Sequence, residues 1–456
     1  MTKNLPIWRK WMYGSGDLGF SLTSTIVAAY FAIFLTDVVG VRAGVAGIAI
    51  AVGKIWDWVN DPLFGYISDH TRTRWGRRRP FLLFGAIPFA LVFTLMWWKP
   101  PLQSDAALVV YYAFVYVLYE ATATMIYMPY FALTPELTSD YDERTSLTSV
   151  RAFFSIFGSL LAFTIPLAII GGFSPENAQN VLVMGITFAV ISTIPLFVVF
   201  FGTRERPEFM HQQQPGLLES LKASLKNRPF IFSAIIFLFT WLSIDILQTI
   251  LLYFIKHGVD QEANSDLIMG TIFVVGIFAL PLWTWTSRKL NKRLAYIIGM
   301  VFFAGVLLVL INLTPLTPLS IILGLCVLAG IGVSAAHVIP WSMIPDAIEF
   351  GELDTGKRYE GMFYSLISLS QKVASSVAIP LALLMLDITG YIPNSSQQPT
   401  SAVNGIRFLV GPIPAVLLSI GILFAALYPL GRERYTQIAL ELEERRLTHP
   451  AEEAEP

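Results

Sequence analysis

Long apolar runs, separated by short polar segments, make up most of this sequence. A bilayer core about 30 Å thick needs about 20 apolar residues for each spanning helix, and runs of that length recur from one end of the chain to the other. They predict an all-α, polytopic membrane protein. Its expected spans are residues 12–38, 44–66, 80–98, 107–133, 149–171, 181–202, 230–255, 266–287, 294–313, 318–343, 360–387 and 408–430.

The composition excludes several other classes of protein. Only 14% of the residues are charged, whereas a soluble chain has about 25%. The formal net charge of −1 provides no basic field for nucleic acid. The single cysteine, Cys326, lies in an apolar run and cannot form an internal disulfide, so redox chemistry is not expected. The N-terminal segment lacks the apolar core and cleavage site of a signal peptide, so we expect no removable leader.

The basic residues predict how the chain is oriented. If the N-terminus is cytoplasmic, 25 of the 31 Lys and Arg residues fall in the tails and cytoplasmic loops. Only four fall in the outer loops, namely Arg42, Lys99, Lys256 and Arg407. Cytoplasmic loops carry this kind of excess. We therefore expect a multi-pass protein of the plasma (inner) membrane with both termini in the cytoplasm.

The longest polar segment between spans, residues 203–229, divides them six and six. This predicts an N-terminal six-helix bundle (1–202), a cytoplasmic middle loop (203–229), a C-terminal six-helix bundle (230–430) and a cytoplasmic tail (431–456). PELTSDYDERTS (135–146) follows the fourth span and PDAIEFGELDTGKRYEG (345–361) follows the tenth, and both contain proline, acidic clusters and an arginine. Such internal repeats are typical of secondary transporters.

The second span carries charges in the stretch KIWDWVNDPLFGY (54–66). Lys54, Asp57 and Asp61 are spaced three and four residues apart, so they share one face of a helix. At ~1.5 Å per residue, Asp57 lies about 18 Å from the outer end of this span. Charges at such a depth are costly and usually functional. A structural salt bridge between Lys54 and one aspartate would leave the second carboxylate unpaired, whereas a bound cation such as Na⁺, which prefers hard oxygen ligands, would neutralise both.

The fourth and eleventh spans contain further polar side chains. Glu120, Thr124 and Tyr127 share one face of the fourth span. Thr124 is either a cation ligand or a hydroxyl bonded to the carbonyl four residues earlier. Ser368 and Lys372 lie near the middle of the eleventh span. Three roles are open for Lys372: pairing with a carboxylate of the first half, binding solute oxygens, or forming a purely structural bridge.

Two other polar residues stand alone in the second half. Asp245 lies in the seventh span and His337 in the tenth. A histidine in such a position is more often a packed residue than a ligand, so we expect His337 to pack. Neither residue is assigned to a site.

Charged residues near the predicted cytoplasmic ends of helices are expected to gate the protein. GYISDHTRTRWGRRRP (65–80) combines Asp69 with five arginines, which suits a salt-bridged hinge that breaks and reforms. Alternatively, the arginines simply hold this loop inside. The candidate gating residues are Lys54, Asp69, Arg77, Arg78, Arg144 and Arg358.

Several motifs together indicate a family. They are YGSGD (13–17), FLTDVVG (34–40), KIWDWVNDPLFGY, TRTRWGRRRPF (71–81), TMIYMPYFALTPELTSDYDERTSL (124–147), Arg151 and the QK pair of the eleventh span. In these motifs the chain resembles the glycoside–pentoside–hexuronide:cation symporters of the major facilitator superfamily. The resemblance implies twelve helices in two pseudo-symmetric bundles, and co-transport of a sugar-like solute with Na⁺, Li⁺ or H⁺. It also implies basic residues at the cavity (Lys54, Arg151 and Lys372) and a cation site at Asp57, Asn60, Asp61 and Thr124.

The chain departs from the family pattern at the solute site. The carboxylates that hold sugar hydroxyls in the family correspond here to Ser21 and Tyr127. Asp17 and Glu120 lie on the same helical faces and are candidate replacements. The full set of candidate solute residues is Asp17, Ser21, Glu120, Tyr127, Arg151, Trp341, Ser368 and Lys372.

These features predict a cation-coupled symporter that works by alternating access, without a cofactor and as a monomer. The expected solute is a glycoside, an oligosaccharide or a uronate. Na⁺ is favoured over H⁺ as the coupling ion because Asn60 adds a neutral oxygen to the carboxylates. A carrier of lysophospholipid or another amphiphile is the main alternative, which Tyr127, Phe131 and Trp341 favour slightly. A membrane enzyme or sensor is a remote alternative, because the sequence contains no HExxH, Walker or His/Cys motif and no appended domain.

Overall fold

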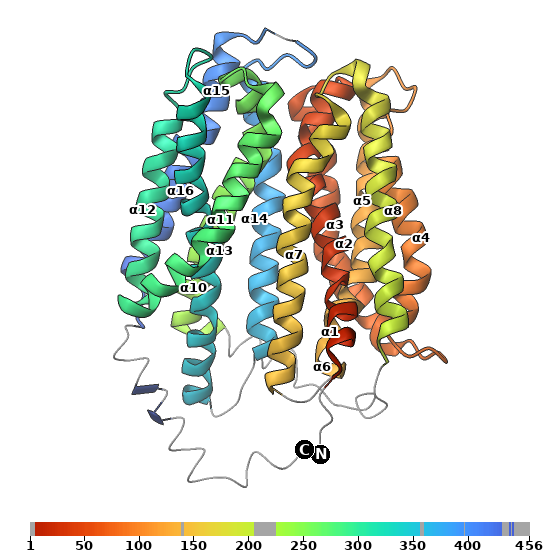
Figure 1. Ribbon diagram of the computed structural model, residues 1–456, viewed down its shortest axis with the longest axis vertical. Coiled ribbons are helices and arrows are strands. Elements are labelled where there is room, and N and C mark those ends of the chain that lie inside the picture. Colours follow the sequence, from red (N-terminus) through yellow and green to blue (C-terminus); the bar gives the residue numbers. More distant parts are fainter. Residues whose placement is uncertain are drawn as a thin grey trace.

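Backbone groups in lipid must be hydrogen-bonded within the chain, so an apolar sequence of this kind forms helices. The computed structural model describes residues 5–137, 141–204, 225–355, 360–395, 397–430, 437–438 and 440–441. Long helices run side by side along most of these residues (Figure 1). The expectation of an all-α, polytopic bundle is therefore confirmed.

The first group of helices covers residues 7–202. It consists of α1 (Ile7–Gly14), α2 (Gly16–Ile33) with its π-helical end η1 (Phe34–Val39), α3 (Ala43–His70), α4 (Arg79–Met96), α5 (Asp105–Ala132), α6 (Thr134–Leu137), α7 (Tyr141–Ile170), the 3₁₀ turn η2 (Pro175–Asn177) and α8 (Ala178–Gly202).

The second group covers residues 228–426. It consists of α10 (Arg228–Tyr253) with its π-helical end η4 (Phe254–Gly258), the 3₁₀ turn η5 (Glu262–Asn264), α11 (Ser265–Lys289), α12 (Lys292–Leu310), α13 (Leu319–Thr355), α14 (Glu360–Ile388), α15 (Thr400–Val410) and α16 (Pro412–Ala426). The start of α10 is fixed locally, because the Asn227 side chain accepts a hydrogen bond from the Phe230 amide and Pro229 occupies the first turn.

Eleven helical stretches of the described residues are long and apolar enough to cross a membrane. The remaining predicted span is α3, which has 28 residues and is therefore about 42 Å long at ~1.5 Å per residue. It runs alongside the other helices of the first group (Figure 1). Lys54, Asp57 and Asp61 make α3 less apolar than its neighbours.

Several predicted helix ends are wrong. Helix α13 continues to Thr355 and α3 to His70, because a helix can extend past the apolar layer into water. The last span begins at Thr400 rather than 408 and consists of α15 and α16. The two parts are separated at Gly411, since Pro412 has no amide hydrogen for the preceding turn. Arg407, which was assigned to an outer loop, thus lies in the last turn of α15.

The two groups of helices repeat the same packing. In the first group α2 contacts α7 and α8, α3 contacts α5, and α4 contacts α5 and α8. In the second group α10 contacts α14 and α16, α11 contacts α13, and α12 contacts α13 and α16. The groups meet through α3 with α14, α7 with α11, and α2 with α10. We call them the N-half and the C-half.

Helices α3 and α5 approach each other closely at Gly53. A Cβ atom at this position would lie 1.9 Å from Cδ1 of Tyr116 on α5, so any larger residue would force the helices apart. This contact brings the charged stripe of α3 against the polar stripe of α5.

Candidate functional site

A cluster of charges lies between α3, α5 and α14. The Lys372 ammonium from α14 is 3.0 Å from Oδ1 of Asp57 and 2.5 Å from Oδ2 of Asp61 on α3. Thr124 on α5 donates its hydroxyl toward both aspartates, with oxygen–oxygen distances of 3.4 Å. Lys372 thus pairs with carboxylates of the other half, one of the roles open to it, and Thr124 faces the aspartates instead of a backbone carbonyl.

Lys54 pairs with a different carboxylate. Its ammonium lies 2.9 Å from Oε1 of Glu120 on α5 and 5.7 Å from the ring centroid of Tyr116. The alternative of a Lys54–aspartate salt bridge therefore does not occur, because α5 supplies the partner. Glu120, expected among the solute residues, and Lys54, expected among the gating residues, form one ion pair at the edge of the cluster.

Asn60 provides an acceptor with no donor. Its Nδ2 donates to the Glu120 carbonyl at 2.8 Å, while its buried Oδ1 has no hydrogen-bond partner among the described residues. Leaving a buried acceptor unsatisfied costs about 1–3 kcal/mol. Two carboxylates, a hydroxyl and this amide oxygen suit a small monovalent cation. The Lys372 ammonium stands in for such a cation at the carboxylates.

The cluster is approached from one side. The Asp57 side chain is 8% exposed, but Asp61, one turn nearer the predicted cytoplasmic end, is 34% exposed. On α14, Ser368 is exposed and Lys372 is half-buried. Exposure therefore falls from the predicted cytoplasmic end toward the middle of the bundle.

A second ion pair joins the halves at the opposite end, the upper end in Figure 1. There the Lys256 ammonium on η4 lies 2.8 Å from Oδ2 of Asp37 on η1 and 2.6 Å from the carbonyl of Phe173. Tyr391 donates its hydroxyl to the other Asp37 oxygen. Burial and the Asp37 carboxylate raise the pKa of Tyr391 well above its usual range, so the phenol keeps its proton. We call Asp37, Lys256 and Tyr391, with the 2.8 Å Thr36–Tyr253 hydroxyl contact beside them, the outer network.

The outer network has a symmetric basis. Asp37 and Lys256 both lie in π-helical turns, and these turns end equivalent helices of the two halves. Single π-helical turns are rare and often lie at functional sites. The Asp37 side chain is only 2% exposed, so this end of the bundle is closed by paired charges.

Comparison with known sequences assigns the family. The sequence model of MFS/sugar transport proteins matches residues 12–432. The chain belongs to this family. The expected resemblance to cation symporters of the major facilitator superfamily is thus confirmed, and the protein is an integral membrane transporter rather than an enzyme.

Its relatives carry different solutes. A symporter of Synechocystis is 32% identical, with 97% of this chain and 98% of the relative covered. A sodium-dependent lysophosphatidylcholine symporter of Danio rerio is 28% identical (94% and 87% covered), and an isoprimeverose transporter of Lactiplantibacillus pentosus is 29% identical (92% and 89% covered). The solved D-xylose-proton symporter has the same fold, with a TM-score of 0.65, 15% identity, and 92% and 96% covered. These relatives indicate a cation-coupled symporter.

In this transporter, two of the expected solute residues bind each other. Nε of Arg151 on α7 lies 2.6 Å from Oδ2 of Asp17 on α2, and Tyr130 on α5 donates to the same oxygen at 2.7 Å. The guanidinium also lies 4.8 Å from the ring centroid of Phe131. Ser21 donates to Ser155 of α7 at 2.9 Å. In this conformation these groups brace α2, α5 and α7 of the N-half.

The remaining solute candidates are spread over both halves. Tyr127 is 2% exposed, and its ring packs against Phe20 and Phe89 with centroid distances of 4.9 and 5.8 Å. Trp341 is half-buried on α13 and lies edge-on to Phe237 at 5.0 Å. Of the expected solute residues, only Glu120, Ser368 and Lys372 lie in or beside the charge cluster.

The candidate gating residues are only partly described. Arg77 and Arg78 lie half-buried in the 71–78 turn between α3 and α4, and both make interactions there. Asp69 is in the last turn of α3 and Arg144 in the first turn of α7, whereas Arg358 lies outside the described residues.

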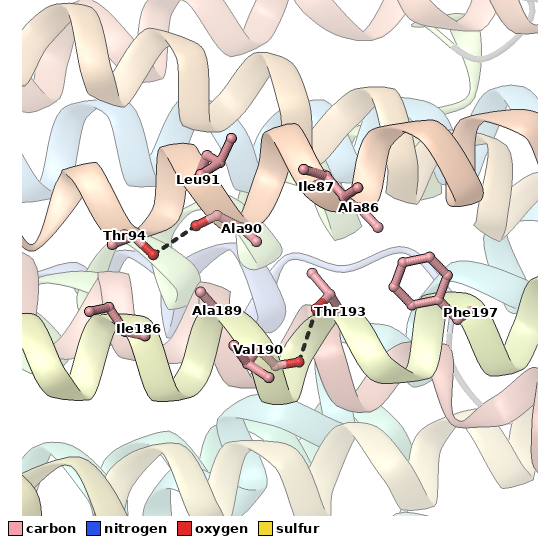
Figure 2. Close-up of a pocket in the computed structure, with 10 residues that line it drawn as sticks. All are labelled: Ala86, Ile87, Ala90, Leu91, Thr94, Ile186, Ala189, Val190, Thr193 and Phe197. Atoms are coloured by element: carbon pink, nitrogen blue, oxygen red, sulfur yellow. Dashed lines mark hydrogen bonds between the residues drawn. The ribbon is translucent and has the colours of Figure 1, made fainter.

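A groove between α4 and α8 is a poor candidate for the solute. Figure 2 shows its aliphatic lining, with a volume of about 240 Å³. Both of its hydroxyls are used within their own helices, Thr94 by the carbonyl of Ala90 and Thr193 by that of Val190. Ile87 and Leu91 are among the most exposed apolar residues. The groove therefore suits contact with lipid chains.

Sequence reasoning missed the outer network. Asp37 belongs to the motif FLTDVVG, and Lys256 was assigned to a loop. The available signal was that each is an isolated charge at the end of an equivalent span, the first and the seventh. Nothing local identifies Tyr391, which comes from the turn after α14.

Proposed function

We propose that this protein is a Na⁺-coupled symporter of a sugar or glycoside. The observation that best supports the proposal is the Lys372 ammonium on the Asp57 and Asp61 carboxylates, beside the unsatisfied Asn60 oxygen. Asp57, Asn60, Asp61 and Thr124 would bind the ion. Li⁺ or H⁺ would use the same carboxylates.

Exchange of two cations would couple the ion to the solute. When Na⁺ enters from the exposed Asp61 side, it competes with the Lys372 ammonium for the same oxygens. The displaced ammonium, with Ser368 one turn away on α14, then turns toward solute oxygens. A hydrogen bond to a charged group contributes about 1.5–3 kcal/mol, so each bound species would favour the other about ten- to a hundredfold.

The closed outer network and the partly exposed cluster together suit alternating access. For solute to enter from the outside, the Lys256–Asp37 pair must separate while the opposite ends of α3 and α14 come together. The site would then remain between the halves as they rock. The sugar assignment is also supported by the names of relatives, which include an isoprimeverose transporter and a putative glycoside/cation symporter of Escherichia coli.

An amphiphile such as lysophosphatidylcholine is the second candidate solute. Trp241, Trp341 and Tyr364 pack as partly buried aromatic residues around one small core of the C-half, and an acyl chain would pack well against such a surface. Relatives named as sodium-dependent lysophosphatidylcholine symporters support this candidate.

Counterflow in proteoliposomes distinguishes the two. The purified protein would be reconstituted with a panel of glycosides, uronates and lysophospholipids, with and without Na⁺. Na⁺-stimulated exchange of a glycoside supports the proposal. Exchange of lysophospholipid alone supports the second candidate, and exchange that is indifferent to Na⁺ but steeply dependent on pH contradicts Na⁺ coupling.

A further inference from the structure

Asp245 is a buried carboxyl group that the cation site does not use. It lies near the middle of α10 and is 8% exposed. Its Oδ2 accepts a hydrogen bond from the Ser375 hydroxyl of α14 at 2.6 Å. Asp245 therefore sits in the C-half, whereas Asp57, Asp61 and Glu120 all belong to the N-half.

Asp245 also lacks the counter-ion that every other carboxylate in the middle of the bundle has. Lys54 pairs with Glu120, and Lys372 pairs with Asp57 and Asp61. Among the residues that the structure describes, no basic group forms an ion pair with Asp245. Four carboxyl groups thus share two lysines, and one Na⁺ would still leave one negative charge uncompensated. A carboxylate buried without a partner is strongly disfavoured in a membrane.

No other group near Asp245 supplies that charge. Lys54 attracts it electrostatically from α3 but is hydrogen-bonded to Glu120. On α13, His337 contacts Trp241, one turn from Asp245, with ring centroids 5.2 Å apart. Its Nδ1 faces the Val333 carbonyl at 2.9 Å.

The other elements packed on α10 contribute no free charge in the described region. The charged and titratable groups of α2, α15 and η4 are bound elsewhere, and α16 has none. These groups are Asp17 with Arg151, Tyr30 with the Phe163 carbonyl, Arg407 with the Leu313 carbonyl, Lys256 with Asp37, and His257 with Tyr391.

We propose that Asp245 binds a proton that is exchanged during the transport cycle, as a second coupling site in the C-half. The proposal rests on Na⁺ coupling at Asp57 and Asp61. A proton fits better than a second metal ion because one hydroxyl, from Ser375, is the only other oxygen bonded to the carboxyl group. The proton is taken up by the Asp245 carboxylate on one side of the membrane and released from the carboxylic acid on the other. One solute then moves with two positive charges.

Infrared spectroscopy of the purified protein tests the proton site without any solute. A neutral carboxylic acid has a carbonyl band that its carboxylate lacks. The wild type should show such a band that disappears between about pH 5 and pH 9, and Asp245→Asn should lack it. Ser375→Ala should keep the band at a higher frequency, because the carboxyl group has lost a hydrogen bond. Asp266→Asn, which removes an exposed carboxylate at the start of α11, is the matched control and should match the wild type.

A transport measurement tests coupling, using the solute that the counterflow panel identifies. With equal Na⁺ on both sides and the membrane potential clamped, an outside-acid pH gradient should drive accumulation by the wild type and Asp266→Asn. Asp245→Asn should only equilibrate the solute, yet still accumulate it when a Na⁺ gradient is imposed.

Three results would overturn the proposal. They are an unchanged band in Asp245→Asn, a band that persists through the whole pH range, and accumulation by Asp245→Asn equal to that of the wild type under the pH gradient. Na⁺ binding, measured by calorimetry on Asp57→Asn and Asp245→Asn, keeps the two sites apart. Loss in Asp57→Asn alone supports the cation site, and retention in both contradicts the proposed function without bearing on Asp245.

Discussion

Two lysines of the C-half reach carboxylates of the N-half, one in the middle of the bundle and one at its outer end. Lys372 lies between Asp57 and Asp61, and Lys256 lies against Asp37. The first contact is partly exposed and has the unsatisfied Asn60 oxygen beside it, whereas the second is buried and its aspartate accepts further hydrogen bonds from Thr36 and Tyr391.

The difference shows how similar ion pairs serve different roles. A pair with an open side and a spare acceptor can exchange its ammonium for another cation at little cost. A buried pair with all its hydrogen bonds made is costly to break, because separation leaves charges without partners. We therefore expect the middle pair to exchange cations while the outer pair holds the halves closed, and the predictions below test this contrast.

The largest effect is expected from Asp57→Asn. Loss of one of the two carboxylates should reduce Na⁺ affinity by about 100-fold or more, equivalent to about 2.7 kcal/mol, and abolish Na⁺-driven accumulation. Downhill exchange of solute should persist in part. Accumulation under a Na⁺ gradient equal to that of the wild type would contradict an exchangeable cation at this pair, and Asp105→Asn, at the exposed start of α5, is the control.

Lys256→Ala should open the outer end. It leaves Asp37 buried without its main counter-ion, at a cost of about 3–5 kcal/mol, so the closed population should fall about 100-fold or more. Labelling of Val41→Cys, a buried outer position, by an impermeant maleimide reports this in a Cys326→Ala background. Combining Lys256→Ala with Asp37→Asn should restore part of the protection, and equal labelling rates in all variants would show that this pair does not lock the end.

Glu120→Gln should separate the two ion pairs of the middle cluster. If Glu120 contributes to solute binding through its pairing with Lys54, solute affinity should fall about ten- to a hundredfold. Na⁺ affinity measured without solute should stay close to that of the wild type. The opposite pattern, with Na⁺ binding lost and solute binding kept, would place Glu120 in the cation site.

The smallest effect is expected from Tyr391→Phe, which removes one hydrogen bond to Asp37 and should increase Val41→Cys labelling by about tenfold or less. Because the pKa of Tyr391 is raised, its hydroxyl donates at every pH below that raised value and is lost only above it. Labelling of the wild type should therefore stay constant from about pH 7 to pH 10. A rise near the ordinary tyrosine pKa would show that the phenol is not held in its neutral form.

The sequence by itself determined the features that depend on neighbouring residues. Apolar length fixed the number and position of the spans, since a backbone in lipid must form a helix. The spacing of Lys54, Asp57 and Asp61 fixed a shared helical face. Helix ends were less predictable, as α3 and α13 show, because apolar length marks the lipid layer and not the end of the helix.

Only the tertiary structure decided which charges meet. Lys372 is 311 positions from Asp61, Lys256 is 219 from Asp37, and Lys54 is 66 from Glu120. A helix face predicts that a charge points into the bundle, but the partner depends on which helices pack together and at what depth. Lys54 consequently binds Glu120 rather than its neighbours on α3, and Asp245 is left with a hydroxyl where the other three carboxylates have lysines, because no lysine of a packed helix reaches its depth.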